Sequence, residues 1–457
     1  DTSVTNKGIL TEGRKEHFEI TKLTNFKNIN YLCVETFESK VSVAYAGLLK
    51  VKKGQRSFDT FEKSFHLRVN KGETICFTKI FSICNSRDGG NLEKKTVKAL
   101  REGLASGFDG LLKKHIKAWE KSWNFADIFL KPDRDTQRFL RFNIYHLLIC
   151  GNEFNERVSI GARTLSGEGY RGHIFWDTEI FILPFFIYTN PGAAKNMLLY
   201  RYHTLDAARM NAMVENYKGA LFAWESADDG FEVTPKWHRD LDGRMIKIHT
   251  GEMEDHVVAD IAYAVYQYYI STQDHKFMRE AGLEMFFETA RFWASRGEFN
   301  RDKTAYHIHH IIGPDEFHTN ITDNAYTNVL AKFNLTMAAE FYRQHKTSPR
   351  RFFRRLIKKI SLTEREIENW EDIASKIVIP KSKKNGLIES FKGYFQKKYV
   401  PIKALDENFM PLFPKTVQLK DIGRTQLVKQ ADVVMLLHLF PEEYPLKQKK
   451  ENFSYYD

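Results

Sequence analysis

The amino-acid sequence changes character near Asp88-Gly-Gly, and this change restricts the folds open to the chain. Before it, short apolar segments rich in β-branched and aromatic residues predict strands at 31–37, 42–49 and 74–84. After it, residues 91–122 carry apolar side chains at a helical spacing. We therefore expect an antiparallel β-sandwich over residues 1–90 and a helical linker over residues 91–131.

Residues 132–457 consist almost entirely of predicted helices and loops. Apolar side chains line one helical face at 257–268 and another at 326–341. A series of such helices, joined by loops rich in glycine, tryptophan and acidic residues, fits either a helical barrel or a solenoid. Periodicity does not choose between these two architectures.

Composition narrows the class of protein. With 42% apolar and 28% charged residues, the 457-residue chain has a globular rather than a disordered composition. No apolar run approaches the roughly 18–20 residues of a membrane-spanning helix, so we expect no membrane partner. The four cysteines show neither metal-ligand spacing nor a disulfide framework, which indicates a reducing compartment.

The net charge of +11 is concentrated in part between Arg343 and Lys403. Binding to nucleic acid is one interpretation of this basic segment, and a solvated helix face is the other. No nucleic-acid-binding motif accompanies the segment, so we favour the solvated face and expect no nucleic-acid partner.

Three loops hold more aromatic and acidic residues than packing requires. They are Gly167–Glu179, which contains Trp176, then Trp224–Gly230 and Gly313–His318. An aromatic ring covers the apolar face of a sugar, and a neighbouring carboxylate accepts hydrogen bonds from its hydroxyl groups. These loops therefore favour a carbohydrate ligand.

Glu316 is the best candidate for a general acid. It lies on a tight turn beside Pro314 and Phe317, and burial among apolar groups keeps a carboxyl group protonated for donation to a leaving oxygen. Glu225, next to Trp224, is the second candidate. The alternative is that the acidic pair at 315–316 only caps the helix expected from about residue 323.

Two further clusters have a structural and a functional interpretation. His307, His309 and His310 suggest a metal site, but no third ligand has suitable spacing, so we interpret the segment as an ordinary hairpin and expect no metal. Lys429 and Gln430 fall inside a predicted apolar helix, 427–439. They either lie at its solvated end or contact a ligand from its first turn.

Taken together, the motifs resemble one family, the maltose, kojibiose and trehalose phosphorylases of glycoside hydrolase family 65. The segments that carry the resemblance occur in the order of the family and lie at 159–181, 198–205, 224–227, 259–265, 313–316, 323–328 and 429–437. The likeness covers most of the chain and is closest from about residue 150 onward.

The resemblance implies an N-terminal β-sandwich, a helical linker and an (α/α)6 barrel, incomplete at its C-terminal end, over residues 132–457. It also implies phosphorolysis of an α-linked glucose disaccharide with inversion, which yields β-glucose 1-phosphate. Inorganic phosphate would be the co-substrate, with no further cofactor. A cytoplasmic homodimer is the expectation that follows for location and assembly.

The resemblance also implies roles for individual residues. Glu316 stands at the position of the general acid of the family. Trp176 and Asp177 stand where the family holds the non-reducing glucose, and further sugar-binding positions fall on Trp224, Glu225, Lys429 and Gln430.

The sequence departs from the family in one respect. The His-Asp-Ser-Ser loop that contacts phosphate in the family does not occur in these 457 residues, which leads us to expect part of a longer protein. Two alternatives stay open: a related inverting hydrolase that uses water, and a sugar-binding protein without catalysis. No residue pattern identifies the disaccharide.

Overall fold

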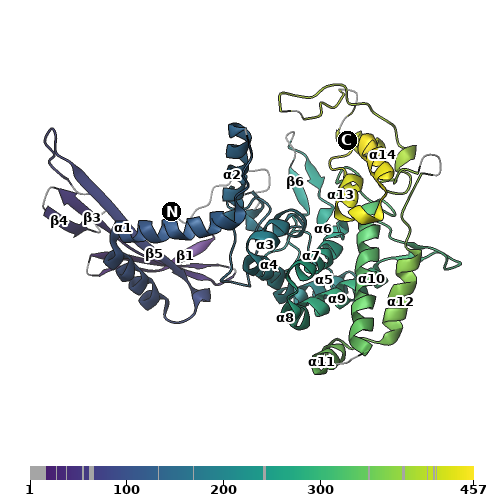
Figure 1. Ribbon diagram of the computed structural model, residues 1–457, viewed down its shortest axis with the longest axis horizontal. Coiled ribbons are helices and arrows are strands. Elements are labelled where there is room, and N and C mark those ends of the chain that lie inside the picture. Colours follow the sequence, from purple (N-terminus) through teal and green to yellow (C-terminus); the bar gives the residue numbers. More distant parts are fainter. Residues whose placement is uncertain are drawn as a thin grey trace. The chain divides into compact units, whose positions relative to one another are not determined.

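The computed structural model describes residues 17–456 except 27, 38, 54–55, 61–65, 132, 168, 240–242, 348–349, 383–385, 409, 415–416 and 418. The chain divides into two compact units, Asp1–Ile144 and Tyr145–Asp457 (Figure 1). An antiparallel sheet dominates the first unit and helices dominate the second, which confirms the predicted fold class.

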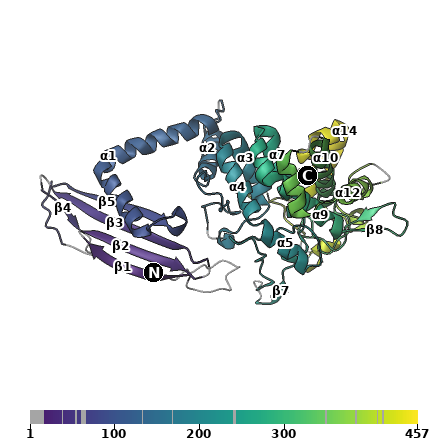
Figure 2. The ribbon, with the colours of Figure 1, turned by 90° about the horizontal axis from the view of Figure 1, so that it is seen from below.

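The first unit contains a five-stranded antiparallel sheet. Its strands are β1 (Phe18–Phe26), β2 (Ile29–Thr36), β3 (Ser42–Lys53), β4 (Arg56–Thr60) and β5 (Ile75–Asn85). They pair in the order β1-β2-β3-β4, and β5 also pairs with β3 (Figure 2). The three strands predicted from the sequence are therefore confirmed as β2, β3 and β5.

Helix α1 (Leu92–Ala126) packs against this sheet. Tyr31 and Ala46 of the sheet are buried against Val97 and Leu100 of the helix. Gly107 interrupts the helix with a φ of 64°, a conformation that glycine adopts without steric cost. Among the described residues, this helix rather than a second sheet covers one face of the β-sheet.

The second unit is built from helices. The longer ones are α3 (Leu183–Thr189), α4 (Pro191–His203), α5 (Leu205–Val214), α7 (Val257–Thr272), α9 (Leu283–Arg296), α10 (Ala325–Thr347), α11 (Arg351–Ile360), α12 (Glu364–Lys376), α13 (Asp432–Leu439) and α14 (Leu446–Tyr456). Helix α2 (Arg134–Leu148) contains the boundary between the units. Both predicted helical faces are confirmed, because Ile261 of α7 and Leu330 of α10 are fully buried where α7, α9 and α10 pack together.

Helix α13 begins later than predicted. The expected helix started at Leu427, but α13 starts at Asp432, so Lys429 and Gln430 lie in the preceding loop. The backbone N–H of Lys429 donates to the Asp315 carboxylate across 2.7 Å. A tertiary contact thus holds the loop that precedes the helix.

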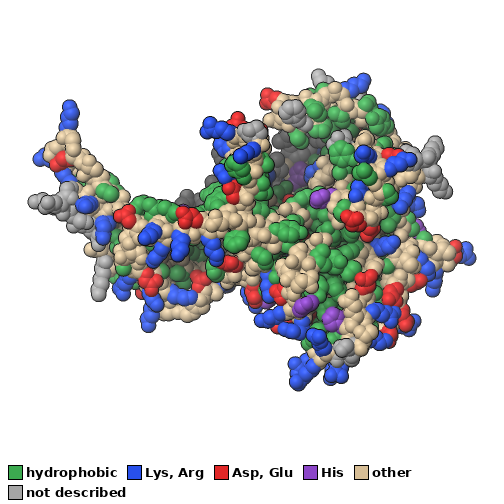
Figure 3. All heavy atoms as spheres, in the orientation of Figure 1, with side chains coloured by type: hydrophobic (Ala, Val, Ile, Leu, Met, Phe, Trp, Pro, Cys, Tyr) green, Lys and Arg blue, Asp and Glu red, His purple; other side chains and the backbone are tan. Residues whose placement is uncertain are grey.

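The basic segment includes α11, whose apolar face is buried and whose basic face is exposed. Phe353, Leu356 and Ile360 pack inward, whereas Arg351 and Arg354 are exposed. Lysine and arginine side chains gather at the lower tip of the molecule in Figure 3, where α11 lies in Figure 1. The basic face of this helix is thus exposed, and its interpretation as a solvated face rather than a nucleic-acid-binding one stays a prediction.

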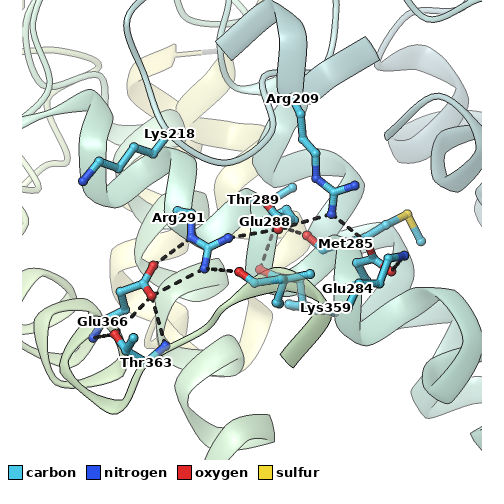
Figure 4. Close-up of polar contacts among 12 residues, drawn as sticks. Arg209, Lys218, Glu284, Met285, Glu288, Thr289, Arg291, Lys359, Thr363 and Glu366 are labelled. Atoms are coloured by element: carbon cyan, nitrogen blue, oxygen red, sulfur yellow. Dashed lines mark hydrogen bonds and ion pairs between the residues drawn. The ribbon is translucent and has the colours of Figure 1, made fainter. Parts of the chain in front are cut away.

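A network of charged side chains joins α5, α9 and α12 (Figure 4). Arg209 contacts Glu284 at 2.7 Å and Glu288 at 3.2 Å. Arg291 joins Glu288 at 3.0 Å to Glu366 at 2.7 Å. Glu284 and Glu288 are nearly buried one turn apart on α9, so the two arginines neutralise their mutual repulsion.

Candidate active site

The predicted acid lies on a turn that other residues hold in place. Gly313 opens the turn, and a Cβ atom there would lie 2.4 Å from Nδ2 of the buried Asn324, so only glycine fits. Asp315 Oδ2 contacts Nδ1 of His318 at 2.5 Å, while its Oδ1 accepts the N–H of Lys429. Asp315 therefore ties the turn to the loop before α13 and does not cap a helix.

Glu316 does not lie buried among apolar groups as predicted, but forms an ion pair with Lys429, with 2.7 Å between Oε1 and Nζ. The Glu316 side chain is 29% exposed and that of Lys429 is 44% exposed. Two residues that are 113 positions apart in the sequence thus meet at one point. Gln430, which follows Lys429 in the same loop, is half-buried.

The loops that bear the two predicted tryptophans lie side by side. The backbone of Ile174 and that of Ser226 exchange two hydrogen bonds of 2.9 Å, which aligns Trp176 with Trp224 across the pair. Both indole rings are buried. The sequence predicted each loop alone, and the structure brings them together.

Glu225 and Asp177 differ in their surroundings. Glu225 Oε1 lies 2.7 Å from Nδ1 of His173, and this pair of a buried carboxylate and a partly exposed histidine stands on the two aligned loops. Burial raises the pKa of Asp177, and the nearby Glu316 carboxylate adds to this rise, whereas His256 and Lys429 oppose it. Asp177, Glu316 and Lys429 therefore share one electrostatic environment.

Sequence reasoning missed His256, which lies between the two tryptophans. Its ring centroid is 4.9 Å from that of Trp176 and 5.4 Å from that of Trp224, both in edge-on contacts. Its Nδ1 contacts Asp260 at 2.7 Å. The signal was present in the sequence, because His-x-x-x-Asp places both side chains on one face of the first turn of α7.

Glu254 was also missed, although it lies in the segment Glu-Met-Glu-Asp at 252–255. It follows the short helix α6 (Thr250–Met253), and its side chain is fully buried. Burial, together with the Glu316 carboxylate, raises the pKa of Glu254 well above its usual value. This carboxyl group therefore joins Asp177, Glu316 and Lys429 in the site.

The histidine segment forms the predicted hairpin, with strands β8 (Glu298–Phe299) and β9 (Tyr306–His307). His307 pairs with Asp323 at 2.7 Å, and His310 lies 2.6 Å from the Asn320 side chain. Throughout the described part of the chain, no three His, Cys, Asp or Glu side chains are grouped closely enough to hold a metal ion.

The chain belongs to glycosyl hydrolase family 65. The central catalytic domain of that family matches residues 141–457, and its N-terminal domain matches residues 1–122. Across the residues that the structure describes, no helix is long and apolar enough to cross a membrane.

Among its relatives, the chain is similar to the kojibiose phosphorylases. It is 42% identical over 475 residues to that of Caldanaerobacter subterraneus subsp. tengcongensis, covering 100% of this chain and 61% of the relative. It is 46% identical over 406 residues to that of Thermoanaerobacter brockii, covering 88% of this chain and 52% of the relative. The chain thus spans between half and two thirds of the length of these relatives.

A solved structure shows the same architecture. It is assigned as a kojibiose phosphorylase from the human microbiome and superposes with a TM-score of 0.82 at 26% identity. The match covers 100% of this chain and 60% of that one.

Proposed function

We propose that the protein containing these residues cleaves an α-linked glucose disaccharide with phosphate and inverts the anomeric centre, which yields β-glucose 1-phosphate. The observation that carries the proposal is the ion pair between Glu316 and Lys429, with Asp177 in the same electrostatic environment. The similarity to relatives named kojibiose phosphorylases supports it.

In this proposal Glu316 acts as the general acid, which requires that the carboxylate paired with Lys429 first take up a proton. Its proton passes to the glycosidic oxygen while the bond from that oxygen to the anomeric carbon breaks, so the second sugar leaves with a neutral hydroxyl group. A phosphate oxygen attacks the anomeric carbon from the opposite face. Phosphate is already an anionic nucleophile, so the reaction needs no protein base to activate water.

Lys429 has a direct role in this step. Donation leaves Glu316 as a carboxylate, and the ammonium group 2.7 Å away stabilises that charge. The backbone N–H of Lys429 meanwhile fixes Asp315, the residue before the acid. One residue therefore positions the acid and compensates its charge after the proton has left.

The glucosyl group would be held by the six predicted residues, namely Trp176, Asp177, Trp224, Glu225, Lys429 and Gln430. Buried aromatic rings with neighbouring carboxyl groups suit a sugar ring and its hydroxyl groups. A homodimer in the cytoplasm is part of the same proposal and rests on the family resemblance.

The test is to supply maltose, trehalose, kojibiose and nigerose, each with and without phosphate, and to detect glucose 1-phosphate and its anomeric form. We expect phosphate-dependent release of the β anomer from one of the four. Glucose released without phosphate would instead identify the protein as a hydrolase.

Variants test the acid itself. Glu316→Gln should retain sugar binding and lose turnover by about 10²–10⁴-fold, because general acid catalysis contributes about that factor. Glu451→Gln, the same chemical change in helix α14, is the matched control. Unchanged turnover in Glu316→Gln would reject the assignment.

A further inference from the structure

Two buried polar groups in the site have no hydrogen-bond partner within the described part of the chain. They are the carboxyl group of Glu254, at both oxygens, and Nε2 of His256. Both side chains are 0% exposed. A buried polar group without a partner is costly, and such groups in a folded protein call for an explanation.

The hydrogen-bonding character of His256 follows from its other contacts. Nδ1 donates to Asp260 Oδ2 at 2.7 Å, and Asp260 Oδ1 accepts from the hydroxyl group of Tyr326 at 2.9 Å. These bonds fix the ring plane. When Nδ1 alone carries a proton, the lone pair at Nε2 accepts a hydrogen bond.

Glu254 can supply the hydrogen-bond donor that complements the acceptor of His256. Its burial and the neighbouring Glu316 carboxylate raise its pKa, which favours the protonated form, and a protonated carboxyl group donates a hydrogen bond. Glu254 Oε2 lies 3.9 Å from His256 Nε2, which is too long for a direct hydrogen bond. An oxygen atom about 2.8 Å from both atoms would bridge them.

A hydroxyl group matches this arrangement, because it accepts from one partner and donates to the other. Trp176 and Trp224 lie against the ring of His256, so such a hydroxyl group would belong to a sugar held at these rings. We propose that Glu254 and His256 together bind one hydroxyl group of the glucosyl residue. The inference rests on the proposed function and adds two sugar-contacting residues to its site.

Binding of glucose tests the pair without any need for turnover. The intrinsic fluorescence of Trp176 and Trp224, next to His256, reports binding, and the probes are glucose and its 2-, 3-, 4- and 6-deoxy derivatives. We expect one deoxy sugar to bind the wild type about tenfold or more weakly, since it leaves two protein groups unpaired.

Substitutions then assign that loss to the pair. Glu254→Gln keeps a donor and an acceptor and should bind all five sugars nearly as the wild type does. Glu254→Leu should bind glucose as weakly as the wild type binds the deoxy sugar that lacks the hydroxyl group in question. Its affinity for that deoxy sugar should equal the affinity of the wild type for it. Glu298→Leu, on the exposed strand β8, is the matched control and should alter nothing.

Thermal stability separates binding from a structural role. Because the carboxyl group has no partner, Glu254→Leu should raise the melting temperature, whereas loss of a structural contact would lower it. If Glu254→Leu does not fold, the affinities for the five sugars are compared between the wild type and His256→Phe instead. It keeps the aromatic packing but removes the acceptor.

The possible results separate the two proposals. If the wild type binds glucose but Glu254→Leu weakens all five sugars equally, or none, the hydroxyl-binding pair is wrong and the proposed function stands. If the wild type binds no glucose, the proposed function and the pair fall together.

Discussion

The buried ion pair between Arg201 and Glu179 gives the sharpest test of how this site is held. Arg201 Nε donates to Glu179 Oε1 at 2.8 Å, and a second guanidinium nitrogen donates to Oε2 at 2.9 Å. That nitrogen also contacts the carbonyl oxygen of Phe175, the residue before Trp176. The two side chains are 0% and 1% exposed.

The perturbation is Glu179→Gln, which leaves the guanidinium group buried without its counter-charge. Removal of one partner from a buried ion pair costs about 3–5 kcal/mol. At about 2.1 cal/mol/K per residue, unfolding the helical unit of about 310 residues has an entropy of about 0.65 kcal/mol/K. The melting temperature should therefore fall by about 5–8 °C.

Thermal unfolding followed by circular dichroism measures this shift. The control is Glu451→Gln, whose side chain is 46% exposed and whose pairing with Lys447 at 3.9 Å contributes little. The double variant Glu179→Leu/Arg201→Met removes both charges and should cost less than either single change. A shift below about 1 °C for Glu179→Gln, or single costs that add in the double variant, would refute the reasoning.

Three further predictions concern the stability of the helical unit. Gly313→Ala should destabilise the chain by about 1–3 kcal/mol, because the new methyl group meets the hydrogen-bonded side chain of Asn324, and differential scanning calorimetry would show this loss. Burial raises the pKa of Asp432 from 3.8 to about 7, so the folded chain keeps a proton that the unfolded chain releases, and stability should fall as the pH rises from about 4 to about 7. Asp432→Asn should flatten that part of the profile of urea midpoints against pH, and an unchanged slope would contradict the assignment. Thr363→Ala removes the capping box of α12 and should cost about 1 kcal/mol in the same urea titration; no loss would show that the cap is unimportant.

Much of the secondary structure was predictable because its causes are local. The apolar spacing at 257–268 and 326–341 marks the faces that α7 and α10 bury, and a helix buries such a face wherever it packs. The same holds for β2, β3 and β5, whose β-branched and aromatic residues suit a half-buried sheet.

The start of α13 could not be predicted from local pattern. Apolar residues continue from Leu427, but α13 begins only at Asp432, and in the loop before it the N–H of Lys429 donates to Asp315. That acceptor lies 114 positions away, so no local window contains it.

For the site, the sequence by itself determined the reactive groups: the Glu316 carboxyl group, the tryptophans at 176 and 224, and the Lys429 ammonium group. Only the tertiary structure decided which of them meet. It paired Glu316 with Lys429 and placed His256 between the two tryptophans. The physical reason is that side-chain chemistry belongs to each residue, whereas distance, burial and unpaired hydrogen bonds arise only when remote segments pack together.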